Sequence, residues 1–341
     1  MMKKVVTFGE LMLRLEPEGY YRFVQADKFG VTFGGGEANV AVSLANFGYD
    51  ASFVSKLPAH EIGQAAVNSL RQFGVNTGSI LRGGDRIGIY FLEKGASQRP
   101  SKVIYDRKGS AIATAKAEEF DWNSILDGVE WFHFTGITPA LGKEAAKACL
   151  DAVKICKEKG ITVSCDLNYR KKLWTKDEAK ETMSELCKYV DVCIANEEDA
   201  DDVFGIKAKN TSVTSGEVNY DGYKEVATTL KDTFGFKKVA ITLRTSISAS
   251  DNNWAAMLYD GDDFYFSKTY PVHIVDRVGG GDSFGAGLIY ACMENMTPQD
   301  TIEFAVAASC LKHSVEGDYN MMSVDEVKVL AQGDGSGRVQ R

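Results

Sequence analysis

Three glycines followed by an aspartate, Gly279 to Asp282, form the segment of this 341-residue chain best suited to chemistry. The glycines expose backbone N–H groups with no side chain in the way, and an apolar helical run from Phe284 to Met293 follows. N–H groups at a helix N-terminus form an anion site that could hold a phosphoryl group in transfer. The Asp282 carboxylate could accept a proton from an attacking hydroxyl. The plainer alternative is that Asp282 only caps the helix and that the glycines form a tight turn.

A second glycine cluster, Gly34 to Gly36, precedes an expected helix over Glu37–Phe47. It would let the backbone approach a polyhydroxy ligand, with Asn39 hydrogen-bonding a hydroxyl. The alternative is a flexible loop with Asn39 in solvent. A G-x-x-x-x-G-K-[ST] loop and a G-x-G-x-x-G after the first strand are both missing, so neither usual nucleotide fingerprint is present. The four histidines show no metal-binding spacing, and we interpret them as structural.

The two glycine motifs, about 250 residues apart, resemble the two signatures of the ribokinase-like (PfkB) carbohydrate kinases. The similarity runs from about Lys3 to Leu330. It implies transfer of the γ-phosphoryl group of ATP to a sugar hydroxyl, with Mg²⁺ as cofactor. By this resemblance Asp282 is the catalytic base, the N–H groups of Gly279, Gly280 and Gly281 form the anion hole, and the sugar contacts Gly34, Gly35 and Asn39.

Three further segments resemble the 2-keto-3-deoxygluconate kinase branch of this family: Gly88–Phe91, Tyr105–Arg107 followed by Ser110-Ala111, and Asp166–Arg170 followed by Leu173-Trp174. The resemblance implies a sugar pocket lined by Tyr90, Tyr105, Arg107 and Arg170, with Asp318 contacting the sugar acid. An Asx turn is the plainer interpretation of Asp318.

The two arginines have a physical reason independent of the family. A sugar acid carries a carboxylate, which guanidinium groups bind in a bidentate manner, whereas neutral sugars need partners such as Asn and Asp. Arg170 follows an expected strand over Ile161–Cys165, and ligands bind at the carboxyl ends of parallel strands. Arg107 lies at the end of residues 87–107, which we expect to form part of a small lid of strands, and would reach the same pocket from there. The alternative is that both form surface ion pairs or cover apolar surface.

On the nucleotide side we expect Gly279, Gly281, Asn168 and Asn196. From the loop after Leu243 we expect Arg244 and the hydroxyls of Thr245 and Ser246 to take the place of a glycine-containing loop. The family's N-x-x-E motif, which organises water around Mg²⁺, is here Asn196-Glu197-Glu198-Asp199, so the shorter Asp199 replaces the final Glu. An acidic helix N-terminus without metal is the alternative. Relatives have a Gly-containing loop near the phosphates, but residues 244–250 contain no glycine. A requirement for a monovalent cation near Asp276 stays open.

Alternating strands and helices must position these residues. Short apolar runs such as Trp131–Thr135, separated by helical windows such as the one near Lys143–Lys159, predict an α/β protein with a central, mostly parallel sheet covered by helices on both faces. The family resemblance implies that this is the ribokinase-like fold. Residues 11–33 and 87–107 alternate in polarity and predict antiparallel strands that form a small lid beside the main sheet. We expect one kinase domain over residues 1–331 and a disordered tail over 332–341.

Composition limits the function classes. The 39 basic and 47 acidic side chains leave a net charge of −8, which disfavours binding to nucleic acid or to an anionic membrane surface. No apolar run approaches the ~20 residues of a membrane helix or forms a signal-peptide core. The seven cysteines are odd in number and include no C-x-x-C pair, so we expect reduced thiols and a cytoplasmic protein. We also expect a homo-oligomer, with the exposed lid sheet as its interface.

The leading hypothesis is therefore a kinase of 2-dehydro-3-deoxy-D-gluconate that uses ATP and phosphorylates the 6-hydroxyl. The first alternative is a fructokinase or another neutral-sugar kinase of the same family. A catalytically silent sugar sensor is a second alternative, which release of ADP would exclude. A hydride-transferring Rossmann enzyme lacks its dinucleotide fingerprint.

Overall fold

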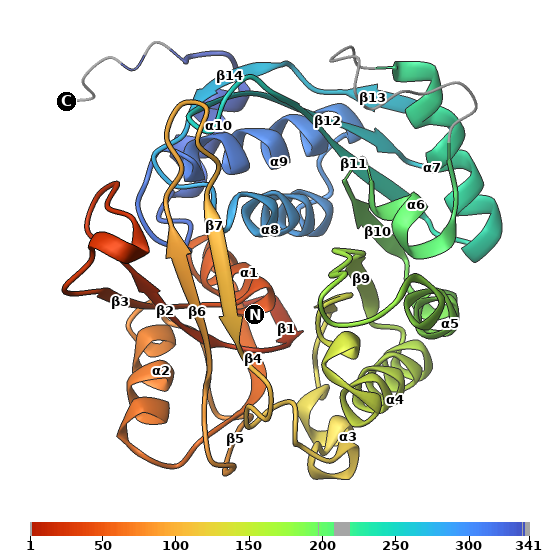
Figure 1. Cartoon of the computed structure of the whole chain (residues 1–341). Helices are drawn as coiled ribbons and strands as arrows, with labels where there is room; N and C mark the ends of the chain where they lie inside the picture. The colour runs from red at the N-terminus through yellow and green to blue at the C-terminus, as the bar shows by residue number, and fades with distance from the viewer. Residues whose placement is uncertain (1, 197, 208–218, 336, 338–341) are drawn as a thin grey trace.

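The computed structural model describes residues 2–196, 198–207, 219–335 and 337, in which strands and helices alternate (Figure 1). The strands are β1 (Lys4–Phe8), β2 (Met12–Glu16), β3 (Gly30–Gly34), β4 (Asp50–Leu57), β5 (Ile80–Arg82), β6 (Gly88–Glu93), β7 (Lys102–Asp106), β8 (Trp131–Thr135), β9 (Thr162–Asp166), β10 (Val192–Ala195), β11 (Lys238–Ser246), β12 (Asp251–Tyr259), β13 (Phe264–Phe266) and β14 (Tyr270–His273). The α-helices are α1 (Gly36–Asn46), α2 (Glu61–Arg71), α3 (Trp122–Ile125), α4 (Lys143–Lys159), α5 (Lys176–Leu186), α6 (Asp199–Phe204), α7 (Tyr220–Phe234), α8 (Gly280–Met293), α9 (Pro298–Lys312) and α10 (Val324–Ala331).

The main sheet has ten strands in the order β13-β12-β11-β10-β9-β8-β1-β4-β5, with β14 also paired to β12. All pairs from β11 to β5 are parallel, whereas β12 to β14 pair in antiparallel fashion. The expected mostly parallel α/β architecture is therefore confirmed. A parallel arrangement requires long crossovers between neighbouring strands, and helices such as α4 and α5 supply them.

Helices cover both faces of this sheet, as Figure 1 shows. Side chains alternate along each strand, so β1 sends Phe8 into the core formed with α4, α5 and α7, and Val5 into the core formed with α1, α8 and α9. In β8, Phe132 lies in the first of these cores and its neighbour Trp131 lies in the second. With both faces buried, the strands consist of nearly continuous apolar runs.

A second, four-stranded sheet has the order β3-β2-β6-β7 and packs beside the main sheet. Its β2–β3 and β6–β7 pairs are antiparallel, but β2 and β6 are parallel. The expectation of antiparallel strands was wrong for this pair. The chain between β2 and β6 passes through α1 and β4 of the main body, and that long connection permits a parallel pairing.

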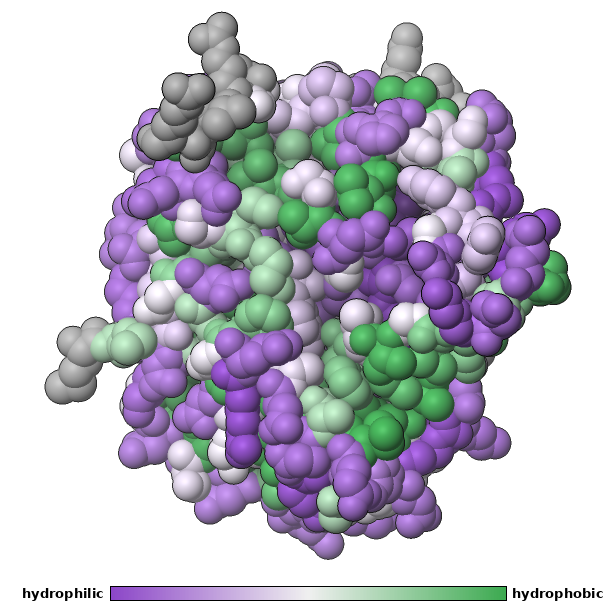
Figure 2. Space-filling view, turned by 90° about the vertical axis from the view of Figure 1, so that its left-hand side faces the viewer, coloured by the Kyte–Doolittle hydropathy of each residue, from purple (hydrophilic) through white to green (hydrophobic). Residues whose placement is uncertain are grey.

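One face of this second sheet is apolar and partly exposed. Leu15 pairs with Val31 on one side and with Phe91 on the other, and Phe91 pairs with Ile104, so the four side chains form a row across all four strands. Val31 is 61% exposed and Ile104 is 53% exposed. Figure 2 looks at the side of the molecule where β3 lies and shows apolar residues gathered in a patch there. The opposite face carries buried Arg14 and Tyr90.

Residues 244–250 differ from the expected loop. Arg244, Thr245 and Ser246 continue β11 and pair with Trp254, Asn253 and Asn252 of β12, so the hairpin connection contains only residues 247–250. Residues 336 and 338–341 of the expected disordered tail lie outside the described residues. No helix in the described ranges is long and apolar enough to cross a membrane.

Candidate active site

A cavity of about 390 Å³ lies where the main sheet, the second sheet and the N-termini of α1 and α8 meet. It contains almost all the residues that the sequence singled out. These are Gly34, Gly35, Asn39, Tyr90, Tyr105, Arg107, Asn168, Arg170, Asn196, Asp199, Arg244, Gly279, Gly281, Asp282 and Asp318. Three predicted residues, Thr245, Ser246 and Gly280, do not line it.

The two glycine motifs meet at this cavity. A Cβ at Gly34 would lie 1.9 Å from the Asp318 carboxylate, and a Cβ at Gly36 would lie 3.4 Å from Asp282 Oδ1. Gly279 is the N-cap of α8 with φ +81°, and a Cβ there would lie 1.9 Å from the Asp318 carbonyl oxygen. The close packing of these segments therefore requires glycine at positions 34 and 279.

The glycine turn presents its N–H groups unequally. Gly281 has no atom near its Cβ position and lines the cavity. The Gly280 N–H, in contrast, donates to the Arg277 carbonyl at 3.3 Å, and the Gly280 Cβ position lies against the His313 ring. Gly280 is therefore turned away from the cavity, contrary to the prediction that all three glycines form its wall.

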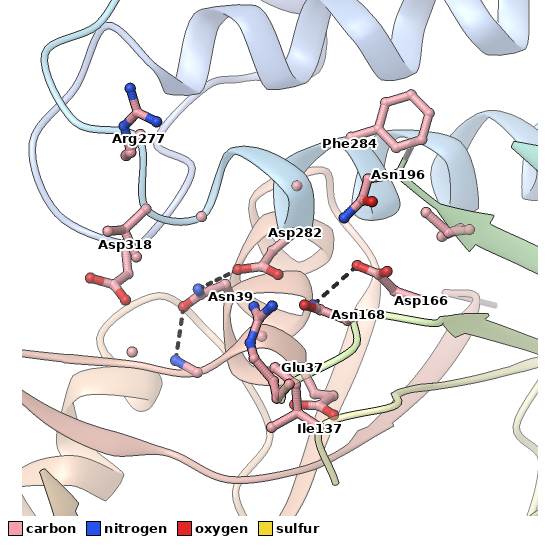
Figure 3. Close-up of a pocket in the computed structure, with 18 of the residues that line it drawn as sticks. Glu37, Asn39, Ile137, Asp166, Asn168, Asn196, Arg277, Asp282, Phe284 and Asp318 are labelled. Atoms are coloured by element: carbon pink, nitrogen blue, oxygen red, sulfur yellow. Dashed lines mark hydrogen bonds between the residues drawn. The ribbon is translucent and has the colours of Figure 1, made fainter. Parts of the chain in front are cut away.

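Asp282 lies at the start of α8 and faces Asn39 of α1 (Figure 3). The Asn39 Nδ2 group donates to Asp282 Oδ2 at 2.6 Å, and Asn39 Oδ1 accepts from the Gly35 N–H at 3.3 Å. Burial raises the pKa of Asp282 to about 7, against the lowering effect of the Asn39 hydrogen bond, and nearby Glu37 adds to the rise. A carboxyl group of this pKa can take a proton at neutral pH.

Glu37 itself is a buried acid that the sequence did not single out. Its Oε1 atom accepts from the Thr135 N–H at 3.0 Å, from the Thr135 hydroxyl at 2.8 Å and from the Thr138 hydroxyl at 2.6 Å. These bonds fix the first turn of α1 to the loop after β8. They thereby help to hold Asn39 in position beside Asp282.

The two arginines at the cavity differ in their partners. Arg107 donates through Nε at 2.7 Å and through Nη2 to Glu10 Oε2, and its guanidinium lies 5.5 Å from the Tyr105 ring centre. The Ser110 hydroxyl donates to the other Glu10 oxygen at 2.6 Å. Within the described residues, Arg170 donates one hydrogen bond, from Nη1 to the Tyr169 carbonyl at 3.3 Å. Glu10 is a second site residue that sequence reasoning missed.

Asp318 is anchored by groups of the second sheet. Its Oδ1 atom accepts from Arg14 Nη1 at 2.6 Å, and its Oδ2 atom accepts from the Tyr90 hydroxyl. Arg14 is fully buried and also donates to Asp276 at 2.5 Å. Asp318, the predicted contact to the sugar acid, lines the cavity and is also an ion-pair partner that connects the second sheet to the glycine turn, which is more than the alternative of an Asx turn implies.

Acidic and amide groups from the ends of β9 and β10 form another part of the wall. Asp166 accepts from Asn168 Nδ2 at 3.3 Å (Figure 3). Asp199 accepts from the N–H groups of Tyr169 at 3.1 Å and Asn196 at 2.9 Å, so it holds the two loops together. Burial, followed by the charge of Asp199, raises the pKa of Asp166. Glu197 of the predicted N-x-x-E segment lies outside the described residues.

These groups fit Mg²⁺ that arrives on a nucleotide. Within the described ranges no group of three or more His, Cys, Asp or Glu residues is arranged to hold a metal by itself. Mg²⁺ in phosphoryl-transfer sites keeps several waters and uses one or two carboxylates together with substrate phosphates. The neighbouring carboxylates of Asp166 and Asp199 supply that number. Burial is the main cause of the raised pKa of Asp166, and the negative charge of Asp199, which a cation would offset, is the second.

Two cationic side chains line the cavity near β11 and the glycine turn. Arg244 comes from β11, and Arg277 precedes the turn and donates to the Ala249 carbonyl at 2.9 Å. Burial and the neighbouring Arg244 lower the pKa of Arg277. Two like charges beside one cavity favour a polyanionic ligand, such as a chain of phosphates. Sequence reasoning did not select Arg277, although it adjoins the motif.

Comparisons with known proteins agree with this site. Residues 2–325 match the profile of the pfkB family carbohydrate kinases. The chain is 55% identical to the 2-dehydro-3-deoxygluconokinase of Thermotoga maritima, whose crystal structure superposes with a TM-score of 0.93 over 98% of this chain and 99% of that one. It is 30% identical to the 2-dehydro-3-deoxygalactonokinase of Haloferax volcanii over 99% of both chains.

The likeness to a more distant neighbour shows the fold alone. This is a ribokinase II from E. coli solved with ATP and Mg²⁺, 20% identical, with a TM-score of 0.81 over 97% of this chain and 99% of that one. The profile match spans nearly the whole chain, and relatives at 30% and 55% identity cover it almost end to end. The chain therefore belongs to the pfkB family of carbohydrate kinases and is itself a kinase.

Proposed function

We propose that this enzyme transfers the γ-phosphoryl group of ATP to the 6-hydroxyl of 2-dehydro-3-deoxy-D-gluconate. The observation that carries the proposal is that one cavity contains Asp282 beside the amides of a glycine turn and also two arginines, Arg107 and Arg170. Asp282 and the amides suit phosphoryl transfer, and the two arginines suit the carboxylate of a sugar acid. The names of the Thermotoga maritima and Haloferax volcanii relatives support a sugar acid as the acceptor.

Asp282 is the proposed base. It takes the proton of the 6-hydroxyl as that oxygen forms a bond to the γ-phosphorus and the bond from the γ-phosphorus to the bridging oxygen of ADP breaks. Asn39 keeps the Asp282 carboxylate in place through its 2.6 Å hydrogen bond. The N–H groups of Gly279 and Gly281, at the positive end of α8, stabilise negative charge on the transferring group.

The carboxylate of the acceptor binds at the arginines. Each arginine has five N–H donors. Within the described residues Arg170 uses one of them for the Tyr169 carbonyl, and Arg107 uses two for Glu10, so both can donate to a ligand. Tyr90 and Tyr105 supply further contacts to the sugar chain, beside Gly34 and Gly35. Holding one end of the acceptor in this way determines which hydroxyl reaches Asp282.

ATP binds with its phosphates toward Arg244 and Arg277, with Asn168 and Asn196 at the neighbouring loops. Mg²⁺ would neutralise charge on the phosphates, held through water by Asp166 and Asp199. Thr245 and Ser246 have no part in this proposal, because β11 carries them away from the cavity wall.

A neutral-sugar kinase, such as a fructokinase, is the alternative, and one observation favours it. Glu10 is 3% exposed and already pairs with Arg107, so part of the charge that would attract a sugar acid is neutralised within the protein. If Arg107 serves only to hold Glu10, the acceptor needs no carboxylate.

A substrate panel separates these functions. ADP release is measured by a coupled assay with 2-dehydro-3-deoxygluconate, 2-dehydro-3-deoxygalactonate, fructose and ribose as acceptors. We expect kcat/KM for at least one sugar acid to exceed that for both neutral sugars by about 100-fold or more, as expected when a charged group is bound by a matching pair of arginines. Faster turnover of fructose or ribose would exclude the sugar-acid assignment and support the alternative.

The apolar face of the second sheet supports the expectation of a homo-oligomer, in which a second copy covers Leu15, Val31, Phe91 and Ile104. Light scattering tests it. A dimer that becomes a monomer on Val31→Lys substitution supports this interface, and a monomer in the unmodified protein contradicts it.

A further inference from the structure

Lys312, in the last turn of α9, is a buried cation to which the proposed reaction assigns no part. Its side chain is 0% exposed, and its Nζ group donates to the carbonyl oxygen of Asp276 at 3.2 Å. Its Cε atom lies 3.4 Å from the position that a Cβ on Gly279 would take. Lys312 does not line the cavity. Its ammonium therefore lies behind the glycine turn, on the side away from the ligands.

The carboxylate of Asp276 is fully engaged as well. Its Oδ2 atom accepts from Arg14 Nη2 at 2.5 Å and from the Gly317 N–H at 3.1 Å, and its Oδ1 atom accepts from the Val278 N–H at 3.0 Å. Asp276 is 3% exposed. Both its main-chain carbonyl and its carboxylate thus bind cationic side chains of this chain.

The buried charges balance without any added ion. Among the side chains that are nearly inaccessible to water, Arg14 and Lys312 contribute two positive charges, and Asp276 and Asp318 contribute two negative ones. Arg14 also donates to Glu16 at 2.5 Å, but Glu16 is 18% exposed and has the Lys94 ammonium 4.0 Å away as a second positive partner. Buried charges are tolerated when they are paired in this way, and an unpaired extra charge is costly. A monovalent cation at Asp276 would find the Asp276 oxygens already occupied and would leave the cluster with an uncompensated positive charge. The residues present therefore do not fit such an ion.

We propose that Lys312 and Arg14 are internal cations that replace a bound monovalent cation at the glycine turn, so that phosphoryl transfer by this enzyme does not depend on K⁺. The inference rests on the proposed kinase reaction at Asp282. Lys312 is a positioning residue: it holds the carbonyl of Asp276 at the start of the turn and adds positive potential behind the amides of Gly279 and Gly281. Its effect is therefore on the transition-state charge rather than on acceptor binding.

The first test measures the unmodified enzyme in K⁺-free buffer, with choline chloride or KCl at equal ionic strength. We expect kcat to agree within twofold in the two salts. We also expect thermal unfolding of the ligand-free protein to show no K⁺-specific stabilisation, since an ion bound only to the folded state would raise the midpoint. A K⁺-specific rise of fivefold or more in kcat, or a midpoint raised only by KCl, would overturn the inference.

The second test is Lys312→Met, which keeps an unbranched side chain and removes the charge. We expect kcat to fall about tenfold or more, with KM for the acceptor changed less than threefold. Lys147→Met, the same change at a side chain 58% exposed on α4, should leave kcat unchanged. In Lys312→Ala, ammonium chloride should restore at least threefold more activity than choline chloride. Lys312→Met activity within twofold of the unmodified enzyme would refute the role of Lys312.

These results can be told apart from failure of the proposed function. The substrate panel identifies which acceptor is turned over, and the salt and Lys312 experiments are then run with that acceptor, whichever it is. The thermal unfolding comparison needs no substrate. An enzyme that prefers fructose would contradict the sugar-acid proposal. It would not decide the inference about Lys312 and K⁺, which the salt and Lys312 experiments test separately.

Discussion

Replacing the proposed base with its neutral isostere, Asp282→Asn, should stabilise the protein while it abolishes turnover. The Asp282 carboxyl is buried, and burial raises its pKa from 3.8 to about 7. Between these two values the folded state binds more protons than the unfolded state, so the free energy of unfolding falls as pH rises through this window. An asparagine does not titrate, and its carbonyl can still accept from Asn39.

The magnitude follows from that shift. At 1.36 kcal/mol per pKa unit, about three units correspond to about 4 kcal/mol at pH 8, where the carboxyl is ionised in both states. At pH 4 the destabilisation caused by this pKa difference is less than about 1 kcal/mol, because the carboxyl is then largely protonated in the folded state. We therefore expect Asp282→Asn to exceed the unmodified enzyme in unfolding free energy by an amount that grows with pH. Its kcat should fall about 10³-fold, since the amide cannot accept the proton.

Urea denaturation at pH 4, 6 and 8, combined with initial rates, measures both effects. Asp127→Asn is the matched control, because it makes the same chemical change at an exposed turn. Its stability difference should stay within about 0.5 kcal/mol at every pH. The difference in unfolding free energy between Asp282→Asn and the unmodified enzyme could instead be independent of pH, or shrink as pH rises. Either result would show that folding does not hold Asp282 as a buried carboxylate with a raised pKa. Normal kcat in this variant would refute the base.

Arg170→Met should raise KM for a sugar acid about tenfold or more and leave the kinetics with fructose unchanged, whereas an equal effect on both acceptors would contradict a carboxylate contact. Gly281→Ala places a methyl group in open cavity space, so urea denaturation should show no loss of stability while turnover falls; full turnover would show that no ligand approaches there. Gly279→Ala, at φ +81° and with a carbonyl oxygen 1.9 Å from the new Cβ, should instead lose about 2 kcal/mol or more, and an unchanged midpoint would disprove the close packing. Asn39→Ala removes the bond that lowers the pKa of Asp282, so the acidic limb of the kcat–pH profile should move to higher pH; an unmoved limb would contradict the role of Asn39.

Local sequence patterns were sufficient to predict the strands and helices of the main sheet and to mark the two glycine motifs that meet at the cavity. The strand Trp131–Thr135 and the helix Lys143–Lys159 have the predicted bounds, because a largely aromatic run and a helical period each end just before a glycine, Gly136 and Gly160. Gly279 and Gly34 marked places where backbones approach closely, and the structure brings both against Asp318.

Pairing partners could not be predicted in the same way. Alternation along Met12–Glu16 shows that the strand has two faces, but it does not say which strand lies beside it, and the parallel partner β6 is far along the chain. The alternation also does not show which face is buried, since Leu15 is partly exposed and Arg14 is fully buried. Thr245 and Ser246 were expected in a loop because the partner strand β12 was not recognised.

Buried charges were the least predictable part of the site. Composition would place the charged residues Arg14, Glu10 and Lys312 on the surface. Arg14 and Glu10 are buried with oppositely charged partners from distant segments, and Lys312 is buried with the carbonyl oxygen of Asp276 as its hydrogen-bond acceptor. Such partners become visible only when the fold brings the segments together. The roles of the cavity residues remain predictions for the experiments above.

A crystal structure of the enzyme with 2-dehydro-3-deoxygluconate and a non-hydrolysable ATP analogue would show directly which acceptor atom lies at Asp282. We expect the 6-hydroxyl oxygen within hydrogen-bond reach of an Asp282 carboxylate oxygen, at about 2.6–3.2 Å. We also expect the acceptor's carboxylate on Arg107 and Arg170, and the γ-phosphoryl group at the amides of Gly279 and Gly281. An acceptor bound with its carboxylate toward Asp282, or with no hydroxyl near that side chain, would contradict the assignment of Asp282 as the base for this acceptor.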